Sequence, residues 1–316
     1  MADLRPLGSS GLATPPLVLG GNVFDWTADR PTSFAILDAF FGAGGTMVDT
    51  ADVYSAWVPG HSGGESESVI GEWLRRRGTR EGVLIATKVG MLPGEGGKGL
   101  APARIAAAAE ASLRRLGTDC IDLYYAHQDD ADVPQDAVLE AFDRLVSTGK
   151  VRAIAASNFS ADRLGSALAV GKERGLATYT VLQPHYNLLE RAKFEGPLQQ
   201  LCLVENVGVL PYYGLAAGFL TGKYRKAEEL GRSVRGGRLG GYLSGRGPKV
   251  LAVLDAIAAE TGATQAQIAL AWLAAQPAVT APIASATSLD QVKELIGAMH
   301  LTLNAEQLAR LDEASA

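Results

Sequence analysis

Eight short apolar runs alternate with longer segments of helical periodicity from about residue 15 onward, and this alternation restricts the fold more than any other feature of the chain. Short apolar runs separated by helical segments are typical of repeated βα units, whose strands form a parallel sheet. The predicted strands span residues 16–20, 46–49, 83–88, 121–126, 151–157, 178–183, 207–212 and 280–285. Eight such units predict an α/β protein with a (β/α)8 TIM-barrel fold.

The segments between these strands carry helix patterns and helix stop signals. Residues 30–44, 65–78, 102–117 and 136–149 have apolar positions at helical spacing, and each segment ends in glycine. Glycine is the residue that most often follows the last turn of a helix. Because no linker-like stretch interrupts the series, we predict one domain that spans residues 1–316.

Three segments depart from the repeat. Residues 4–16 carry the turn sequence GSSG between short extended runs, which predicts an N-terminal β-hairpin across the bottom of the barrel. Residues 305–315 have helical spacing after the eighth unit, so we predict an appended C-terminal helix. Residues 225–247 are rich in Gly and Arg and lack apolar periodicity. This last segment is predicted to be a long mobile loop that closes over a bound anion.

Charge and composition exclude several classes of function. The net charge of -5 gives no general attraction for nucleic acid or anionic membranes. The chain has no signal-peptide pattern and no run of about 18 apolar residues, so we expect a cytoplasmic protein. Cys120 and Cys202 are the two cysteines, and their spacing fits no zinc or redox motif. We therefore expect a small-molecule partner and no metal; the oligomeric state is left open.

Ionisable side chains stand at the ends of three consecutive predicted strands. Asp49 ends TMVD, Lys88 ends VLIATK, and His127 follows IDLYYA, while Tyr54 lies five residues after Asp49. In a parallel barrel the carboxyl ends of the strands meet at one mouth, where barrel enzymes keep their reacting groups. We therefore predict that these four side chains share one pocket.

The four residue types suit the protonation of an oxygen atom. A free phenol has a pKa of about 10, and a neighbouring Lys88 ammonium is expected to lower the pKa of Tyr54 and make it a usable proton donor. Asp49 would pair with Lys88, and His127 would donate a hydrogen bond that orients a carbonyl group. None of the four is a redox group, so a nicotinamide cofactor is expected to supply hydride.

The motifs around these residues resemble those of the aldo-keto reductase superfamily, in particular its bacterial members. DTADVY with GGESESVIG is similar to the segment that carries the family's catalytic Asp and Tyr, and LIATK and DLYYAH are similar to its Lys and His segments. The resemblance covers essentially the whole chain. It implies that Asp49, Tyr54, Lys88 and His127 form a catalytic tetrad for reversible carbonyl reduction, with Tyr54 as general acid and NAD(P)H bound without a Rossmann domain.

The resemblance also implies a set of cofactor-binding residues at the other strand ends. Those expected at the nicotinamide half and the pyrophosphate are Gly21, Asn22, Ser157, Asn158, Gln183, Tyr212, Tyr213, Gly214, Leu215, Ala216, Gly218 and Lys223. Those expected at the adenosine half are Ser285, Thr287, Ser288, Gln291 and Glu294.

Two departures from the family pattern bear on the cofactor. Thr287 and Ser288 occupy the place where many relatives have an arginine for the 2′-phosphate of NADP, and Tyr213 and Gly214 replace the Ser and Pro of a YSP segment. NADPH is the cofactor expected from the family, and NADH is not excluded.

The sequence does not name the substrate. Phe24, Trp26 and Trp57 follow the first two predicted strands and are expected to form an apolar wall beside it. Two alternatives are a cofactor-binding redox sensor or regulatory subunit with little turnover, and a barrel aldolase or isomerase with Lys88 as a Schiff base. The neighbouring Asp49 favours a charged lysine and so disfavours the Schiff base.

Overall fold

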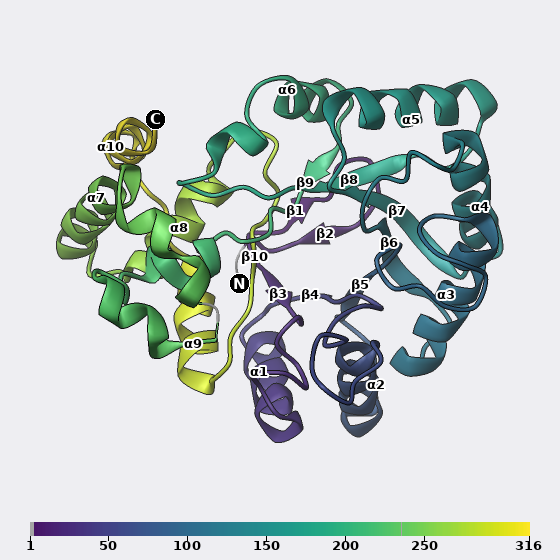
Figure 1. Cartoon of the computed structure of the whole chain (residues 1–316), viewed down its shortest axis with the longest axis horizontal. Coiled ribbons are helices and arrows are strands. Elements are labelled where there is room, and N and C mark those ends of the chain that lie inside the picture. The colour runs from purple at the N-terminus through teal and green to yellow at the C-terminus, as the bar shows by residue number, and fades with distance from the viewer. Residues whose placement is uncertain (1–2, 235) are drawn as a thin grey trace.

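The computed structural model describes residues 3–234 and 236–316, and in these residues eight parallel strands form a curled sheet surrounded by helices (Figure 1). The spatial order is β10-β3-β4-β5-β6-β7-β8-β9. The strands are β3 (Val18–Gly20), β4 (Met47–Asp49), β5 (Leu84–Val89), β6 (Ile121–Ala126), β7 (Val151–Ser157), β8 (Tyr179–Gln183), β9 (Gly208–Val209) and β10 (Ile283–Ala284). The predicted barrel fold is confirmed, and its first, seventh and eighth strands are shorter than predicted.

Backbone hydrogen bonds join β9 to the segment that enters β10 and so close the ring. The amide of Val209 donates to the carbonyl of Ala278 over 3.1 Å, and the amide of Thr280 donates back to Val209 over 2.9 Å. The amide of Ile283 then donates to the carbonyl of Pro211 over 2.9 Å. Closure brings the carboxyl ends of all eight strands around one mouth.

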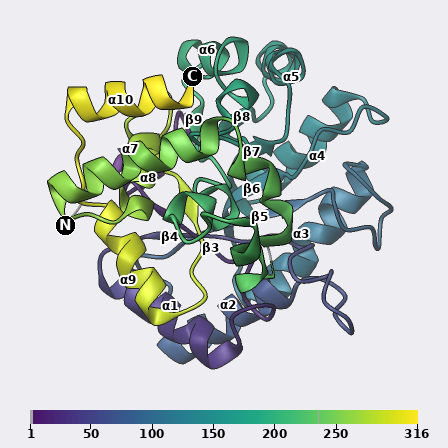
Figure 2. The ribbon, with the colours of Figure 1, turned by 60° about the vertical axis from the view of Figure 1, so that its left-hand side comes forward.

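Helices surround the sheet, and the four segments predicted between strands are helical. They are α1 (Arg30–Gly42), α2 (Glu65–Arg77), α3 (Pro102–Leu116), α4 (Gln135–Ser147), α5 (Ala161–Arg174), α6 (Pro197–Val204), α7 (Arg246–Thr261), α8 (Gln265–Ala274), α9 (Leu289–Ala298) and α10 (Ala305–Ser315). Helix α10 is the predicted C-terminal addition, and it packs beside α7 (Figure 2). None of the helices in the described residues is both long and apolar enough to cross a membrane; the cytoplasmic location stays a prediction.

The hairpin also forms where the sequence predicts it. Strands β1 (Arg5–Pro6) and β2 (Ala13–Thr14) pair antiparallel. Gly8, in the connecting turn, has a φ of +54° and lies against the backbone of Thr180 and Gly208. The turn therefore packs at the amino ends of β8 and β9, which is the bottom of the barrel, away from the mouth.

The segment 225–247 differs from the irregular loop that we predicted. It contains the short 3-10 helices η3 (Ala227–Arg232), η4 (Gly236–Arg238) and η5 (Gly240–Leu243), while residue 235 lies outside the described residues. Leu239 is buried, and the Tyr242 hydroxyl donates to Glu190 Oε1 over 2.8 Å. Isolated residues such as Leu239 are buried here, and they leave no apolar periodicity in the sequence. These short helices were therefore not predicted.

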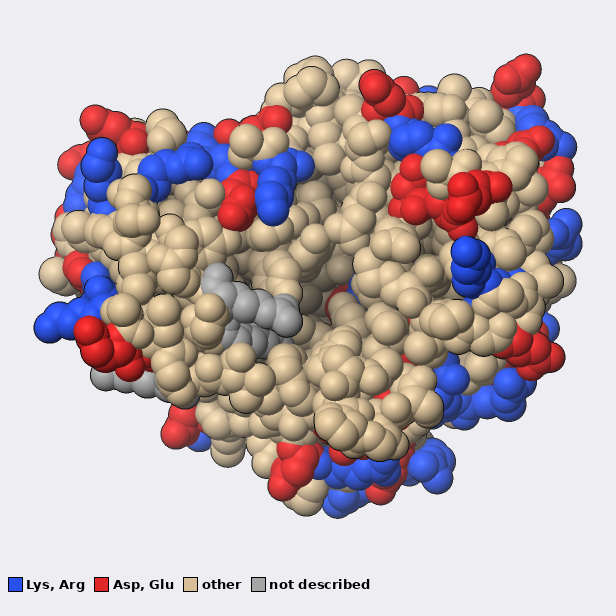
Figure 3. All heavy atoms as spheres, viewed as in Figure 1, with Lys and Arg blue, Asp and Glu red and all other residues tan. Residues whose placement is uncertain are grey.

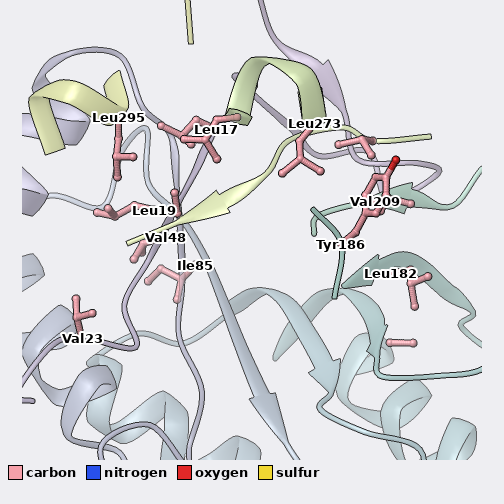
Figure 4. Close-up of a cluster of buried hydrophobic side chains, with 14 of the residues drawn as sticks. Leu17, Leu19, Val23, Val48, Ile85, Leu182, Tyr186, Val209, Leu273 and Leu295 are labelled. Carbon is pink, nitrogen blue, oxygen red and sulfur yellow. The ribbon is translucent and has the colours of Figure 1, made fainter. Parts of the chain in front are cut away.

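Alternation along the strands separates two layers of the core. Leu19, Val48 and Ile85 point outward and belong to a large cluster of buried side chains that also contains Leu273 of α8 and Leu295 of α9 (Figure 4). The alternate residues Val18, Met47, Ala86, Leu123, Tyr125, Ala155, Val181, Leu210 and Ile283 belong to a separate inner cluster. Because strand side chains have a period of two residues, the next inward positions at the mouth are those of Asp49, Lys88, His127, Ser157, Gln183, Tyr212 and Ser285.

Replacing Gly8 by alanine should destabilise the fold more than replacing Gly11 by alanine. A Cβ on Gly8 would collide with backbone atoms of Thr180, Gly208 and Asn206, which cannot move aside like a side chain. We expect Gly8→Ala to lower the free energy of unfolding by more than about 2 kcal/mol, measured by urea denaturation.

Gly11→Ala is the matched control, because Gly11 also has a positive φ but has open space around its Cβ position. Its cost should be about 1 kcal/mol, the conformational penalty alone. Equal losses in the two variants would contradict the close packing of the hairpin turn.

Candidate active site

Lys88 lies at the centre of the predicted pocket, and its side chain is fully buried. Its Nζ donates to Asp49 Oδ2 over 2.6 Å, to the Thr50 carbonyl over 2.7 Å and to the Tyr54 hydroxyl over 2.9 Å. An ammonium group has three N–H donors, so these contacts use all of them. The structure therefore brings together Asp49, Lys88 and Tyr54 as the sequence predicts.

The strands and the turn after β4 set this geometry. Asp49 and Lys88 both continue the inward-facing rows of β4 and β5, while Tyr54 comes from the turn that follows β4. The second Asp49 oxygen, Oδ1, accepts a hydrogen bond from Gln183 Nε2 over 2.8 Å. Asp49 is thus held from two sides, by β5 through Lys88 and by β8 through Gln183.

His127 joins the group from the end of β6. Its backbone amide donates to the Val89 carbonyl over 2.8 Å, and its ring centroid lies 6.0 Å from that of Tyr54. Burial, followed by the positive charge of Lys88, lowers the pKa of His127 well below 6.5. The imidazole is therefore neutral at pH 7 and has one N–H to donate.

The expected effect of Lys88 on the acidity of Tyr54 is wrong for this structure. Burial, followed by the negative charge of Asp49, raises the pKa of Tyr54 well above 10. The ammonium at 2.9 Å does not outweigh these two effects, because Asp49 lies beside the same ammonium and opposes a second negative charge. Tyr54 consequently keeps its proton at neutral pH.

Burial also acts on Lys88, and three carboxylates oppose it. Desolvation lowers the pKa of Lys88, whereas the charges of Asp49, Asp52 and Glu67 raise it. Among the described residues, Asp49 is the carboxylate that forms an ion pair with Lys88, and Asp52 and Glu67 pair with arginines.

The residues predicted at the nicotinamide form a hydrogen-bonded network beside these groups. The Tyr212 hydroxyl donates to Asn158 Oδ1 over 2.8 Å, and Asn158 Nδ2 donates to the His127 carbonyl over 2.9 Å and to Ser157 Oγ over 3.2 Å. Ser157 Oγ donates to the Gln183 carbonyl over 2.9 Å. The network places amide, hydroxyl and aromatic groups at the mouth next to His127.

The residues predicted at the pyrophosphate lie after β9. Tyr213 is 42% exposed and has a φ of 58°, and Gly214 is buried against Leu273. Ala216, Ala217 and Gly218 then have positive φ in succession after Leu215, whose φ is -99°. Two amides are used within this turn, because Ala216 donates to the Tyr213 carbonyl over 2.7 Å and Gly218 donates to the Leu215 carbonyl over 2.9 Å. Lys223 Nζ lies 5.2 Å from the Tyr224 ring centroid, and it also lies beside the backbone of Gly218.

The residues predicted at the adenosine half surround the start of α9. Ser288 caps this helix by accepting from the Gln291 amide, and the Thr287 amide donates to Gln291 Oε1 over 2.9 Å. Ser285 Oγ donates to Asn22 Oδ1 over 2.6 Å, which links β10 to the loop after β3. Glu294 lies in the next turn of α9. Gly21, which was predicted at the nicotinamide half and precedes Asn22, donates its amide to the Asp49 carbonyl over 2.7 Å.

Aromatic rings lie over Tyr54, although not all those that we predicted. Trp57 is 48% exposed, with its ring centroid 5.3 Å from that of Trp26 and 6.2 Å from that of Tyr54. Phe24 is fully buried in the core, so the structure does not bring it to this surface. A space-filling view shows a hollow near the centre of the molecule, with charged atoms at its floor and mostly uncharged residues where its walls are described (Figure 3).

Two further rings lie beside the pocket, those of His185 and Tyr125, and Tyr125 was not predicted from the sequence. His185 lies 5.3 Å from the Tyr212 ring and 5.2 Å from the Tyr213 ring, and Lys88 Nζ lies 5.6 Å from the Tyr125 ring. Counting back by two from His127 along the strand would have placed Tyr125 inside the barrel. Among the described residues no cluster of three His, Cys, Asp or Glu could hold a metal ion.

The buried neutral His127 should make the fold sensitive to acid. Its pKa is lowered in the folded state, so below pH 6.5 the unfolded chain binds a proton that the folded chain does not. Stability from this residue is therefore lost as pH falls. Between pH 7.5 and 5.5 the free energy of unfolding should fall more in the wild type than in His127→Gln, by roughly 1 kcal/mol.

Urea denaturation at the two pH values measures this difference. His300→Gln is the control, because His300 is exposed and should leave the wild-type dependence unchanged. The same loss of stability in His127→Gln and the wild type would contradict a neutral, buried His127.

Comparisons with known proteins agree with this geometry. The family model of the Aldo/keto reductase family matches residues 16–316. The chain is 34% identical to the uncharacterized oxidoreductase YrpG of Bacillus subtilis (97% of this chain, 94% of that protein). It is 31% identical to L-glyceraldehyde 3-phosphate reductase of Escherichia coli K12 (98% and 91%) and 30% identical to aldo-keto reductase AMT2 of Alternaria alternata (99% and 91%). The chain therefore belongs to the aldo/keto reductase family of oxidoreductases, as its motifs indicated.

Proposed function

We propose that the protein reduces an aldehyde or ketone to the alcohol with NAD(P)H, reversibly, and that Tyr54 supplies the proton. The observation that carries this proposal is the contact of Lys88 Nζ with both Asp49 and the Tyr54 hydroxyl at the mouth of the barrel. Membership of the family supports carbonyl chemistry in general. The roles of Tyr54, Lys88 and His127 are inferred from their geometry.

Tyr54 holds its proton before the reaction, because burial keeps its pKa high. As the carbonyl carbon is reduced, negative charge develops on the oxygen, and an alkoxide is a far stronger base than a phenolate. The O–H bond of Tyr54 breaks and a new O–H bond forms on the product. The phenolate that remains lies 2.9 Å from the Lys88 ammonium, which stabilises it until a proton from water restores the phenol.

His127 orients the carbonyl group in this scheme. Its imidazole is neutral because burial lowers its pKa, so it donates a hydrogen bond without competing with Tyr54 as an acid. Trp26 and Trp57 form the apolar wall on the substrate side, whereas Phe24 is excluded by its burial. The identity of the substrate is not assigned.

The residues around the mouth fit a nicotinamide dinucleotide. When bound, a reduced nicotinamide supplies the hydride that reduces the carbonyl carbon. Asn158 and Ser157 offer amide and hydroxyl groups for its carboxamide, and Tyr212 offers a ring for stacking. The start of α9 and the turn at residues 215–218, with Lys223 beside Gly218, suit its phosphates.

NADPH is the preferred cofactor in this proposal, and NADH is the alternative. Thr287 and Ser288 offer hydroxyls, and the α9 helix start offers backbone amides, for a 2′-phosphate. These groups bind phosphate less strongly than an arginine fork does. The geometry also disfavours a Schiff base at Lys88, because all three N–H donors are used and Asp49 Oδ2 lies at 2.6 Å.

Removing the Tyr54 hydroxyl is the direct test of this function. In Tyr54→Phe we expect carbonyl reduction to fall by about 10²- to 10⁴-fold, the usual contribution of a general acid. Fluorescence titration with NADPH and NADH should still show wild-type binding, with NADPH the tighter ligand. Steady-state consumption of the reduced cofactor with a panel of aldehydes and ketones measures the rate.

Tyr179→Phe is the matched control, because Tyr179 begins β8 at the other end of the barrel and packs between Phe142 and Phe159. It should retain wild-type turnover. Unchanged turnover in Tyr54→Phe would refute the assignment, and tight cofactor binding without any turnover in the wild type would favour a redox sensor.

A further inference from the structure

Four buried or half-buried charged side chains form a cluster next to the segment that carries Lys88. Asp52 and Glu67 are fully buried, Arg104 is 6% exposed, and Arg115 is half-buried. None of the four has a role in the proton transfer described above. With all four ionised, the two carboxylates and two guanidinium groups carry no net charge.

Hydrogen bonds attach this cluster to the backbone and side chains around Lys88. The Asp52 amide donates to the Lys88 carbonyl over 3.2 Å, and Asp52 Oδ2 accepts from Arg104 Nη2 over 3.1 Å. Thr87, which precedes Lys88, donates its hydroxyl to Glu67 Oε1 over 2.6 Å. Arg115 Nε donates to Glu67 Oε2 over 2.6 Å.

The carboxylates of Glu67 and Asp52 differ in how many of their oxygens accept a hydrogen bond. Both oxygens of Glu67 accept hydrogen bonds. Asp52 Oδ1, by contrast, has no partner in the described residues, and neither has Arg104 Nε or the buried Tyr124 hydroxyl. A buried carboxylate with one free oxygen keeps its charge less firmly than one with both oxygens bonded. Burial, then the charge of Glu67, raises the pKa of Asp52 to about 7 against the opposing effect of Arg104.

We propose that Asp52 is a positioning residue for the reaction: held by Arg104, its carboxylate keeps Lys88 protonated under alkaline conditions and so extends the pH range in which Tyr54 is paired with an ammonium. The effect on catalysis rests on the proposed function. The electrostatic link between Asp52 and Lys88 does not depend on that function: it rests on the burial of Asp52 and on its place two residues after Thr50, whose carbonyl accepts from Lys88 Nζ.

The direction of the effect follows from the charges that surround Asp52. The charged groups are Lys88 on β5, Asp49 at the end of β4, Glu67 on α2, and Arg104 and Arg115 on α3, and Tyr124 on β6 is the neutral titratable one. Above pH 7 Asp52 is ionised, which opposes the loss of a proton from Lys88 in the range where that loss would occur. Below pH 7 Asp52 becomes neutral, but solution acidity then keeps Lys88 protonated.

The test follows the titration of Lys88 by NMR in protein labelled with ¹³C at lysine Cε. The Lys88 resonance is identified by its loss in Lys88→Met. In Asp52→Asn the titration of Lys88 should move to lower pH than in the wild type. The alkaline limb of the kcat profile for aldehyde reduction should move in the same direction, while kcat below pH 6.5 stays at the wild-type value.

Asp122→Asn is the matched control. Asp122 is also a buried carboxylate paired with arginines, Arg80 and Arg152, but it lies at the start of β6, at the opposite end of the barrel. It should leave both the Lys88 titration and the kcat profile unchanged. A uniform fall of kcat at all pH values in Asp52→Asn, with an unmoved Lys88 titration, is the result of a merely structural role and would overturn the proposal.

The wild-type protein provides a second measurement if Asp52→Asn does not fold. Its Lys88 resonance should show a separate inflection near the Asp52 pKa of about 7, and the absence of this inflection would overturn the electrostatic link. A wild type that shows the inflection but reduces no carbonyl compound would refute the proposed function and leave the link between Asp52 and Lys88 standing.

Discussion

The site depends on one buried ammonium. Taking Lys88 out of water costs several kcal/mol unless its charge and all its donors are satisfied. Asp49 balances the charge through an ion pair. The three N–H groups donate to Asp49, the Thr50 carbonyl and the Tyr54 hydroxyl. Because the same three donors fix where Asp49 and Tyr54 lie, the need to satisfy one buried charge also arranges the groups that transfer a proton.

The barrel makes such a burial possible. A strand alternates its side chains, so a residue two positions beyond an inward apolar residue also points inward. Met47 and Ala86 fill the interior, and Asp49 and Lys88 follow them at the mouth. The polar groups are therefore the last layer of a packed interior, with the hairpin at the opposite end.

This regularity explains how much the sequence predicted. The eight apolar runs, together with the rule that parallel strand ends meet at one mouth, were enough to find the barrel and to predict that Asp49, Lys88 and His127 lie together. Tyr54 lies in a turn; it was predicted from its place five residues after Asp49, and the resemblance of DTADVY to a family motif agreed with that prediction. The contact of Gln183 with Asp49 was not predicted, because it depends on a pairing across the barrel between residues 134 positions apart.

Other features could not be predicted because they depend on competing local effects. The acidity of Tyr54 depends on whether burial and Asp49 outweigh Lys88, which requires the positions of all three groups. Phe24 looked like a pocket residue because it follows a strand, yet its ring turns into the core. Asp52 stands within the same motif as Asp49 and Tyr54, but only the packing of α2 and α3 shows that it is paired with Arg104 and linked to Lys88.

The most direct measurement of the central claim is the rate of a single turnover in Lys88→Met. Stopped-flow mixing of the enzyme, saturated with reduced cofactor, with excess aldehyde follows nicotinamide oxidation apart from product release. The account predicts that the cofactor still binds while the oxidation slows by about 10²- to 10⁴-fold, because the phenolate of Tyr54 has lost its ammonium. Oxidation at the wild-type rate would contradict the account.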